Sequence, residues 1–171
     1  MEASLGFRVG EAGRVDLREL LEQQLDPGFR LARAILLNDA EAEDAVQDAC
    51  LSAWRKRSSL RDPDVFGAWF QRIVVNVCRD RLRRRRREHI RALQLEASLS
   101  VSPTDHQLGN AALDSAVDGL DVEHRLVVLL RYWQDMPVDE IARQLDIPVG
   151  TVKSRLHSAR ERIRMHLETV P

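Results

Sequence analysis

The residues from Asp139 to Leu167 constrain the fold more than any other stretch of the chain. Their apolar residues form two sets, and within each set the steps of three or four mark one face of a helix. The first set is Ile141, Ala142 and Leu145, and the second is Val152, Leu156, Ala159, Ile163 and Leu167. Pro148 and Gly150 suit a short turn between the two helices. A small residue such as Ala142 lets two helices cross closely, so the pattern predicts a helix-turn-helix.

The second of these helices carries an excess of positive charge. Residues 151–167 contain five bases and one acid, a net charge of +4. Side chains away from the apolar face can reach base edges and phosphates in the major groove of duplex DNA. These side chains are Lys153, Ser154, Arg155, His157 and Ser158. Charge alone would favour a solvated helix in a small bundle, whereas turn, small residue and charge together favour DNA binding.

Asp146 lies in the predicted turn, where such motifs usually carry a glycine in the left-handed backbone conformation. Aspartate is among the few other residue types that tolerate this conformation. We therefore expect Asp146 to adopt it without loss of the motif.

The composition predicts an all-α protein made of two small helical domains. Of 171 residues, 44% are hydrophobic and 31% charged, and there are only eight glycines and six prolines. Residues 93–110 contain no Lys or Arg and little periodicity, which is typical of a linker. We expect a flexible N-terminus (residues 1–15), a first domain (16–92), a flexible acidic linker (93–110) and a second domain (111–171) with the helix-turn-helix.

The helices of the first domain can be placed from their apolar spacing. We expect one short helix over residues 16–25, closed by Asp26, Pro27 and Gly28, and a second helical segment over residues 29–37. A long helix is expected over residues 64–87, with Asp62 as a cap and Pro63 at its first position. In the second domain, residues 122–133 form a further predicted helix.

Residues 41–57 predict a helix with a strongly acidic exposed side. Five acids and no base occur among residues 38–54, namely Asp39, Glu41, Glu43, Asp44 and Asp48. Acids at a helix N-terminus are favourable, but this effect explains only two or three of them. The acidic, glutamine-containing face is therefore a candidate surface for a basic protein partner.

The long helix of the first domain ends in five consecutive arginines, residues 83–87, and residues 61–91 have a net charge of +6. Binding to a phosphate backbone is the natural use of such charge, and it should weaken steeply with salt. A solvated tail or a basic localisation tag is the alternative. Trp69 and Phe70 could stack on bases, but their spacing with Ile73 and Val77 indicates core residues first.

Several classes of protein are not indicated by the sequence. No apolar run approaches membrane-spanning length, and the N-terminus lacks an export signal, so we expect a cytoplasmic protein without membrane insertion. Cys50 and Cys78 stand alone in helical patterns and are expected to be reduced and buried, with a regulatory disulfide as the alternative. No metal ligand set, cofactor motif or catalytic constellation can be assembled, so we expect no metal, no cofactor and no enzyme activity.

With these residues described, the chain resembles an extracytoplasmic-function (ECF) sigma factor of bacterial RNA polymerase over roughly residues 17–168. The stretch IPVGTVKSRL is similar to part of the family's region four, which reads the −35 promoter element. The stretch DAEAEDAVQDACLSAWRK resembles the polymerase-binding helix of region two. The stretch FGAWFQRIVVNVCRDRLRRRRR resembles its promoter-melting helix.

The resemblance implies a role for each block of residues. Binding to the clamp helices of the largest subunit of core polymerase falls to Asp44, Gln47, Asp48 and Trp54. Capture of the unpaired non-template strand at the −10 element falls to Arg61, Asp62, Asp64, Asn76, Arg79, Arg83 and Arg84. Reading of the −35 duplex falls to Thr151, Lys153, Ser154, Arg155, His157 and Ser158. Region four would also dock on the polymerase flap, and an anti-sigma factor would hold the chain inactive.

Two positions differ from the usual family pattern. Asp121 stands where the family usually has proline, which should affect only the start of a helix. Ser158 stands where arginine is frequent, which implies one phosphate contact fewer and an altered promoter preference.

A free-standing regulator that binds duplex operators through the helix-turn-helix is the alternative from another class. This alternative leaves the arginine run, the acidic helix and the base-free linker without a role. A nucleic-acid-processing enzyme is excluded, because the acids at residues 39–48 crowd a helix start with no paired acid elsewhere.

Overall fold

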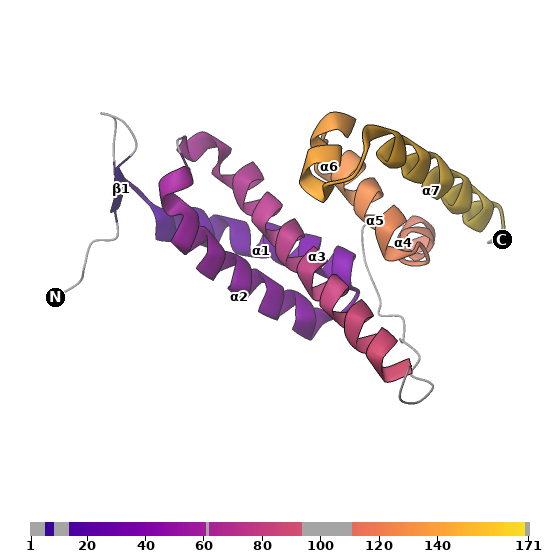
Figure 1. Ribbon diagram of the computed structural model, residues 1–171. Coiled ribbons are helices and arrows are strands. Elements are labelled where there is room, and N and C mark those ends of the chain that lie inside the picture. Colours follow the sequence, from indigo (N-terminus) through magenta and orange to yellow (C-terminus); the bar gives the residue numbers. More distant parts are fainter. Residues whose placement is uncertain (1–5, 9–13, 61, 94–110, 170–171) are drawn as a thin grey trace. The chain divides into compact units, whose positions relative to one another are not determined.

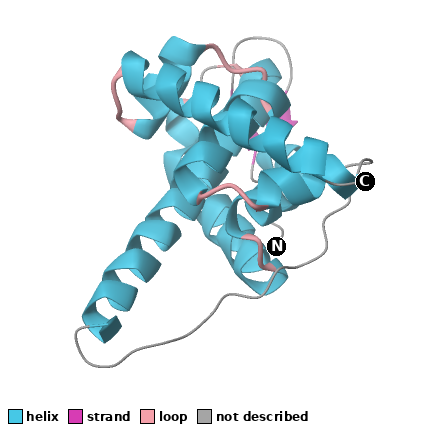
Figure 2. Cartoon of the chain, turned by 90° about the vertical axis from the view of Figure 1, so that its right-hand side faces the viewer, coloured by secondary structure: helices cyan, strands magenta, loops and turns pink. Residues whose placement is uncertain are grey.

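The computed structural model describes residues 6–8, 14–60, 62–93 and 111–169. The chain divides into two compact units, within residues 1–99 and 100–171. Helices make up nearly all of the described structure, as Figure 2 shows in cyan. The predicted all-α class is confirmed. The predicted linker, residues 93–110, lies outside the described residues except for its first.

Three helices build the first unit: α1 (Leu17–Leu36), α2 (Asp39–Lys56) and α3 (Phe66–Leu93) (Figure 1). Short 3-10 turns, η1 (Arg57–Ser59) and η2 (Pro63–Val65), connect α2 to α3. Each helix packs on the other two. The fully buried side chains include Leu31, Ile35, Phe70, Val74 and Cys78. On α2 the buried stripe consists largely of alanines, so its neighbours can approach closely and its opposite side stays exposed.

The predicted break at Pro27 was wrong, because α1 continues through Pro27 without interruption. Gly28, which follows it, lies against α3: a Cβ at this position would be 3.1 Å from Phe70 Cε1. Proline removes one backbone hydrogen bond from a helix. Packing of the buried residues on both sides of Pro27 outweighs that loss.

A short β-ribbon precedes α1, where the sequence analysis expected no element. Strand β1 (Gly6–Arg8) pairs antiparallel with β2 (Arg14–Asp16), and Phe7 lies opposite Val15. Strands of three residues are too short to show a period in the sequence. The remaining residues of this segment, 1–5 and 9–13, lie outside the described part of the chain.

The second unit contains α4 (Ala111–Asp118), α5 (Val122–Val128), α6 (Val138–Leu145) and α7 (Val149–Thr169). The helix predicted over residues 122–133 is present, but its last five residues, Leu129–Trp133, have the wider π-helical turn (η3). The core of this unit includes Val127, Leu130, Ile141 and Val152.

The predicted helix-turn-helix is α6, a short turn and α7. Asp146 ends α6 with φ 54° and ψ 51°, which confirms the left-handed conformation expected of it. The Ile147 N–H then donates to the Ala142 carbonyl at 3.0 Å, which closes the end of the helix. This turn fixes the direction in which α7 leaves α6.

Candidate nucleic-acid and protein interfaces

One side of α2 forms an exposed acidic surface, which consists of Asp44, Gln47, Asp48 and Leu51. The side chains of Asp44 and Asp48 are 65% and 54% exposed. The steps of three and four place these residues on one side of the helix, opposite the buried alanine stripe. Trp54 lies two turns beyond Gln47, is half-buried, and has the Arg57 guanidinium 4.7 Å from its ring centroid.

Leu51 is an addition to the residues named from the sequence. It is 56% exposed and follows Gln47 by one turn. An exposed leucine at one end of the acidic surface gives it an apolar part, which suits a protein partner better than a polyanion. The exposure of Leu51 could have been predicted from the sequence. The spacing of the alanines defines the buried side of α2, and Leu51 does not fall on that side.

Arginines of α3 pair with the acids of α2. Arg81 Nη2 contacts Asp48 Oδ2, and Arg81 Nη1 lies 3.8 Å from Asp44 Oδ2. One turn further along α3, Arg85 Nη1 lies 3.2 Å from Glu41 Oε2. No intramolecular partner for these acids was predicted from the sequence. The pairing could not be read from the sequence, because the partners are 33 to 44 residues apart.

The remaining exposed side of α3 forms a basic surface with Asn76, Arg79, Arg83, Arg84 and Arg87. Asn76, Arg83, Arg84 and Arg87 are exposed, and Arg79 is half-buried. Arg84 Nε lies 3.9 Å from Glu88 Oε1 on the solvent side. The arginine run is therefore divided between two sides of the helix: Arg85 turns toward α2, whereas Arg83, Arg84 and Arg87 stay accessible.

The segment before α3 contains the other residues assigned to the −10 element. Asp62 is a cap as expected, since its Oδ1 accepts from the Asp64 N–H at 2.9 Å, but it caps the 3-10 turn η2 and not the long helix, which begins at Phe66. Asp62 and Asp64 are exposed, and Arg61 lies outside the described residues. Trp69 is half-buried, and its ring centroid lies 5.6 Å from that of Phe66. Phe70 is fully buried and is therefore a core residue.

The residues assigned to the −35 element lie at the start of α7 but on two different sides of it. Lys153, Ser154 and His157 are exposed, on the side opposite the buried Val152. Ser154 Oγ donates to the Thr151 carbonyl at 3.0 Å. These three exposed side chains form the surface of α7 that is accessible to a DNA groove.

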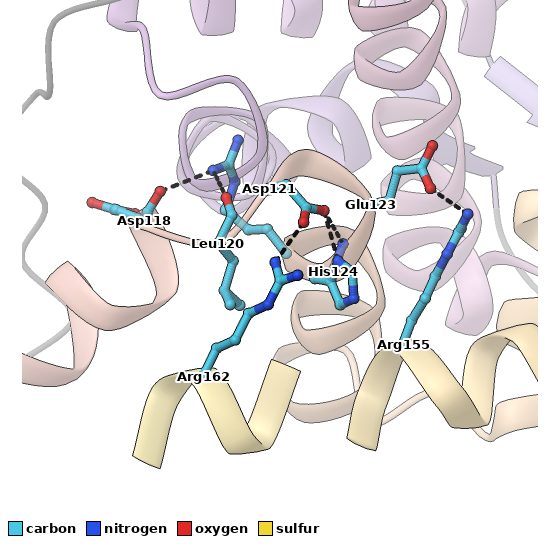
Figure 3. Close-up of polar contacts among 8 residues, drawn as sticks. Asp118, Leu120, Asp121, Glu123, His124, Arg155 and Arg162 are labelled. Atoms are coloured by element: carbon cyan, nitrogen blue, oxygen red, sulfur yellow. Dashed lines mark hydrogen bonds and ion pairs between the residues drawn. The ribbon is translucent and has the colours of Figure 1, made fainter. Parts of the chain in front are cut away.

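Arg155, by contrast, is paired with an acid of α5. Figure 3 shows Arg155 and Arg162 extending from α7 toward the start of α5. Arg155 Nη2 contacts Glu123 Oε2, and Arg162 Nη1 lies 2.6 Å from Asp121 Oδ2. The two arginines are seven residues apart and therefore lie on the same side of α7. Together they attach α7 to α5.

Asp121 has a larger role than the predicted effect on the helix start. It caps α5 through the His124 N–H at 3.2 Å, and its Oδ1 also lies 2.7 Å from His124 Nδ1. Partial burial would raise the pKa of Asp121, but hydrogen bonds from His124 and Arg162 outweigh that effect. They lower the pKa from 3.8 to about 2.

Arg125 is a buried arginine that holds the turn between α4 and α5. Its Nη1 donates to the carbonyls of Asp118 and Leu120, at 3.2 and 2.9 Å. Burial lowers its pKa, while the nearby Asp118 and Asp121 carboxylates act in the opposite direction. This contact positions Asp121 for its own bonds.

Within the part of the chain that the structure describes, cysteine, metal and membrane features add no further site. Cys50 and Cys78 are free thiols: Cys78 is buried as expected, which raises its pKa to about 12, whereas the expected burial of Cys50 was wrong, because it is only half-buried. Among the described residues, no group of three or more His, Cys, Asp or Glu side chains could hold a metal ion. No helix in the described ranges is long and apolar enough to span a bilayer.

Comparison with known proteins matches both units to one family. Residues 20–88 match Sigma-70 region 2, and residues 110–163 match Sigma-70 region 4. The ECF RNA polymerase sigma factor SigM of Mycobacterium tuberculosis is 41% identical over 135 residues, 78% of this chain and 68% of the relative. The RNA polymerase sigma-E factor of Streptomyces coelicolor is 29% identical over 153 residues, 90% of this chain and 86% of the relative.

Solved structures give the same result. The sigma factor RpoE in complex with the anti-sigma factor NepR from Bartonella quintana has a TM-score of 0.70 and 25% identity, covering 91% of this chain and 99% of that one. CnrH in complex with the cytosolic domain of CnrY has a TM-score of 0.57 and 25% identity, covering 90% and 88%.

Two helical units that match regions 2 and 4 define a sigma factor of the Sigma-70 class. Within that class, the chain belongs to the ECF sigma factors of RNA polymerase. Its role is promoter-specific initiation of transcription.

Proposed function

We propose that the chain performs this role through three surfaces, each meeting a different partner. The acidic surface of α2 binds the clamp of core polymerase, the basic surface of α3 binds −10 DNA, and α7 reads the −35 duplex. The linker of residues 93–110 joins region 2, residues 16–92, to region 4, residues 111–171. The observation that supports this division best is the segregation of charge: exposed acids with Leu51 on α2, and exposed bases on α3 and α7.

The polymerase contact is assigned to Asp44, Gln47, Asp48 and Leu51, with Trp54 at its edge. Exposed acids attract a basic partner and orient it, while the half-exposed Leu51 supplies apolar area beside them. Leu51 adds binding area that neither of the acids can provide.

The −10 contact is assigned to Asn76, Arg79, Arg83 and Arg84, together with the segment at Asp62 and Asp64. Extruding a base from the duplex costs a few kcal/mol of stacking, which a shaped pocket offsets. Arg83 and Arg84 are the first two residues of the arginine run, and both are exposed. Their charges can therefore neutralise phosphates of the separated strand.

The −35 contact is assigned first to Lys153, Ser154 and His157, which are exposed on α7. Thr151 and Ser158 lie at the margin of this surface. The ion pair between Arg155 and Glu123 would have to break before Arg155 could contact a base. We assign it to the −35 surface as a residue that orients α7, with DNA contact secondary.

Regulation by an anti-sigma factor is proposed from one of the structural relatives, the sigma factor RpoE, which was solved in complex with the anti-sigma factor NepR. A partner that covered the α2 surface or the exposed part of α7 would prevent polymerase or promoter binding. The chain itself would catalyse nothing, would need no cofactor, and would act in the cytoplasm with the polymerase.

Binding to bacterial core RNA polymerase tests the first assignment. We expect the double charge reversal D44K/D48K to weaken binding at least ten-fold, because it turns attraction into repulsion. The variant E22K/D26K is a matched control, since it makes the same charge change at the same i, i+4 spacing on α1. Equal losses in both variants would show that only net charge matters and would contradict the assignment.

A further inference from the structure

Arg81 connects the two surfaces to which the proposed function gives different partners. It belongs to α3, the DNA-binding helix, yet its guanidinium contacts Asp48 and lies near Asp44, both assigned to polymerase. The Arg81 side chain is 28% exposed, so it is largely packed but still reaches solvent. In the free chain, each surface therefore neutralises part of the charge of the other.

A groove runs along the same part of the first unit and holds these groups together. Its bases are Arg81, Arg83, Arg84, Arg85 and Arg87, and its acids are Glu41, Asp48 and Asp80. A phosphate bound to the accessible arginines of this groove would be close to Arg81. The carboxylate of Asp48 and a phosphate would then compete for one guanidinium, because each presents anionic oxygens in pairs that match the two N–H donors of the arginine fork.

The energies involved permit such an exchange of partners. The acids of the Arg81 pairs are more than half exposed, and ion pairs of this kind contribute little to stability. A basic partner that binds Asp44 and Asp48 can therefore displace Arg81 at small cost. The displaced guanidinium then adds one positive charge to the groove.

We propose that Arg81 is a positioning residue that couples the two surfaces, so that a basic protein on α2 raises the affinity of α3 for DNA. Because thermodynamic coupling is reciprocal, DNA on α3 raises the affinity of α2 for the basic protein by the same factor. The inference rests on the proposed functions of α2 and α3. It adds that, in the free chain, the positive charge of Arg81 is neutralised by Asp48 and becomes available to DNA only when polymerase is bound.

A double-mutant cycle on DNA affinity tests the coupling without polymerase. The probe is a fluorescein-labelled 20-nucleotide oligo(dT), bound to the full chain at low salt and followed by fluorescence anisotropy. D48N releases Arg81 and should tighten binding roughly three-fold, the range expected of an exposed ion pair. In the R81M background, D48N should change binding much less, because no guanidinium remains to be released.

E43Q provides the matched control. Glu43 is exposed on α2 and, among the described residues, forms no ion pair with α3. The variant removes the same charge from the same helix, so it should give an equal, smaller gain in the wild-type and R81M backgrounds. An equal gain from D48N in both backgrounds would overturn the proposal. Circular dichroism melting of each variant excludes unfolding as the cause.

The reciprocal measurement separates this proposal from the proposed function. R81M frees Asp44 and Asp48 and should tighten binding to core polymerase about two- to three-fold. If R81M binds polymerase as tightly as wild type does, the coupling is refuted, but the assignment of the α2 surface to polymerase is not. Coupling in the oligo(dT) cycle without any polymerase binding would instead refute the proposed partner of α2.

Discussion

Replacing Asp121 with asparagine should loosen the attachment of α7 to α5. Asparagine caps a helix about as well as aspartate, so D121N keeps the cap and removes only the charge that binds Arg162 and His124. The pKa of Asp121 is lowered from 3.8 to about 2, a shift that corresponds to about 2.5 kcal/mol at full strength. The side chain is 50% exposed, so solvent screening reduces the expected loss to about 1 kcal/mol.

The pH dependence of this loss follows from the direction of the shift. A carboxylate with a lowered pKa in the folded state stabilises the fold fully above its unfolded value of 3.8. The stabilisation is lost as the pH falls through about 2. Wild type and D121N should therefore differ by about 1 kcal/mol at pH 7, and the difference should shrink progressively below pH 3.8.

Urea unfolding followed through the amide resonances of α7 measures this loss in the second unit alone. A carbon-13 titration of the Asp121 carboxyl group gives its pKa in the same sample. R162M removes one of the two partners and should shift that pKa upward toward 3.8. A midpoint of 3.8 in the wild type, or equal stability of wild type and D121N at pH 7, would refute the reasoning.

Three further changes have expected outcomes. R125M leaves the Asp118 and Leu120 carbonyls without their buried donor, so unfolding in urea should show a loss of about 2–3 kcal/mol. L51S removes apolar area at an exposed position, so it should leave the melting temperature within a few degrees of wild type but weaken core polymerase binding about ten-fold. R84Q removes one phosphate-binding charge, so the plot of log affinity for oligo(dT) against log salt should become less steep by about 0.7; an unchanged slope would exclude Arg84 from the DNA surface.

The helix-turn-helix could be predicted from the sequence because its determinants are local. The apolar steps of α6 and α7 are set by the helix period, and the conformation of Asp146 follows from the shortness of the turn. The cap at Asp62 is local in the same sense, since its acceptor and the Asp64 donor are two residues apart. Each prediction needed only residues within one or two turns of the feature.

The features that the sequence did not reveal depend on packing between helices. Pro27 is a strong local signal for a helix end, but the contact of Gly28 with Phe70, more than forty residues away, keeps α1 continuous. The pairing of Arg81 with Asp48 likewise depends on how α3 lies against α2. Neither contact has a signature in the spacing of nearby residues.

The assigned site residues illustrate the same limit. Lys153 and Arg155 are both basic and both near the start of α7, so the sequence treats them alike. In the structure Lys153 is exposed, whereas Arg155 pairs with Glu123. Their different surroundings follow from the two-residue step, which turns one toward solvent and the other toward α5.

Run-off transcription with bacterial core polymerase on a pool of promoter fragments tests the central claim most directly. We expect transcripts from a subset of fragments only when the chain is present, their loss in D44K/D48K, and their retention in E22K/D26K. No transcript in any condition, together with tight and specific binding of the chain alone to duplex DNA, would contradict the account and identify a free-standing regulator instead.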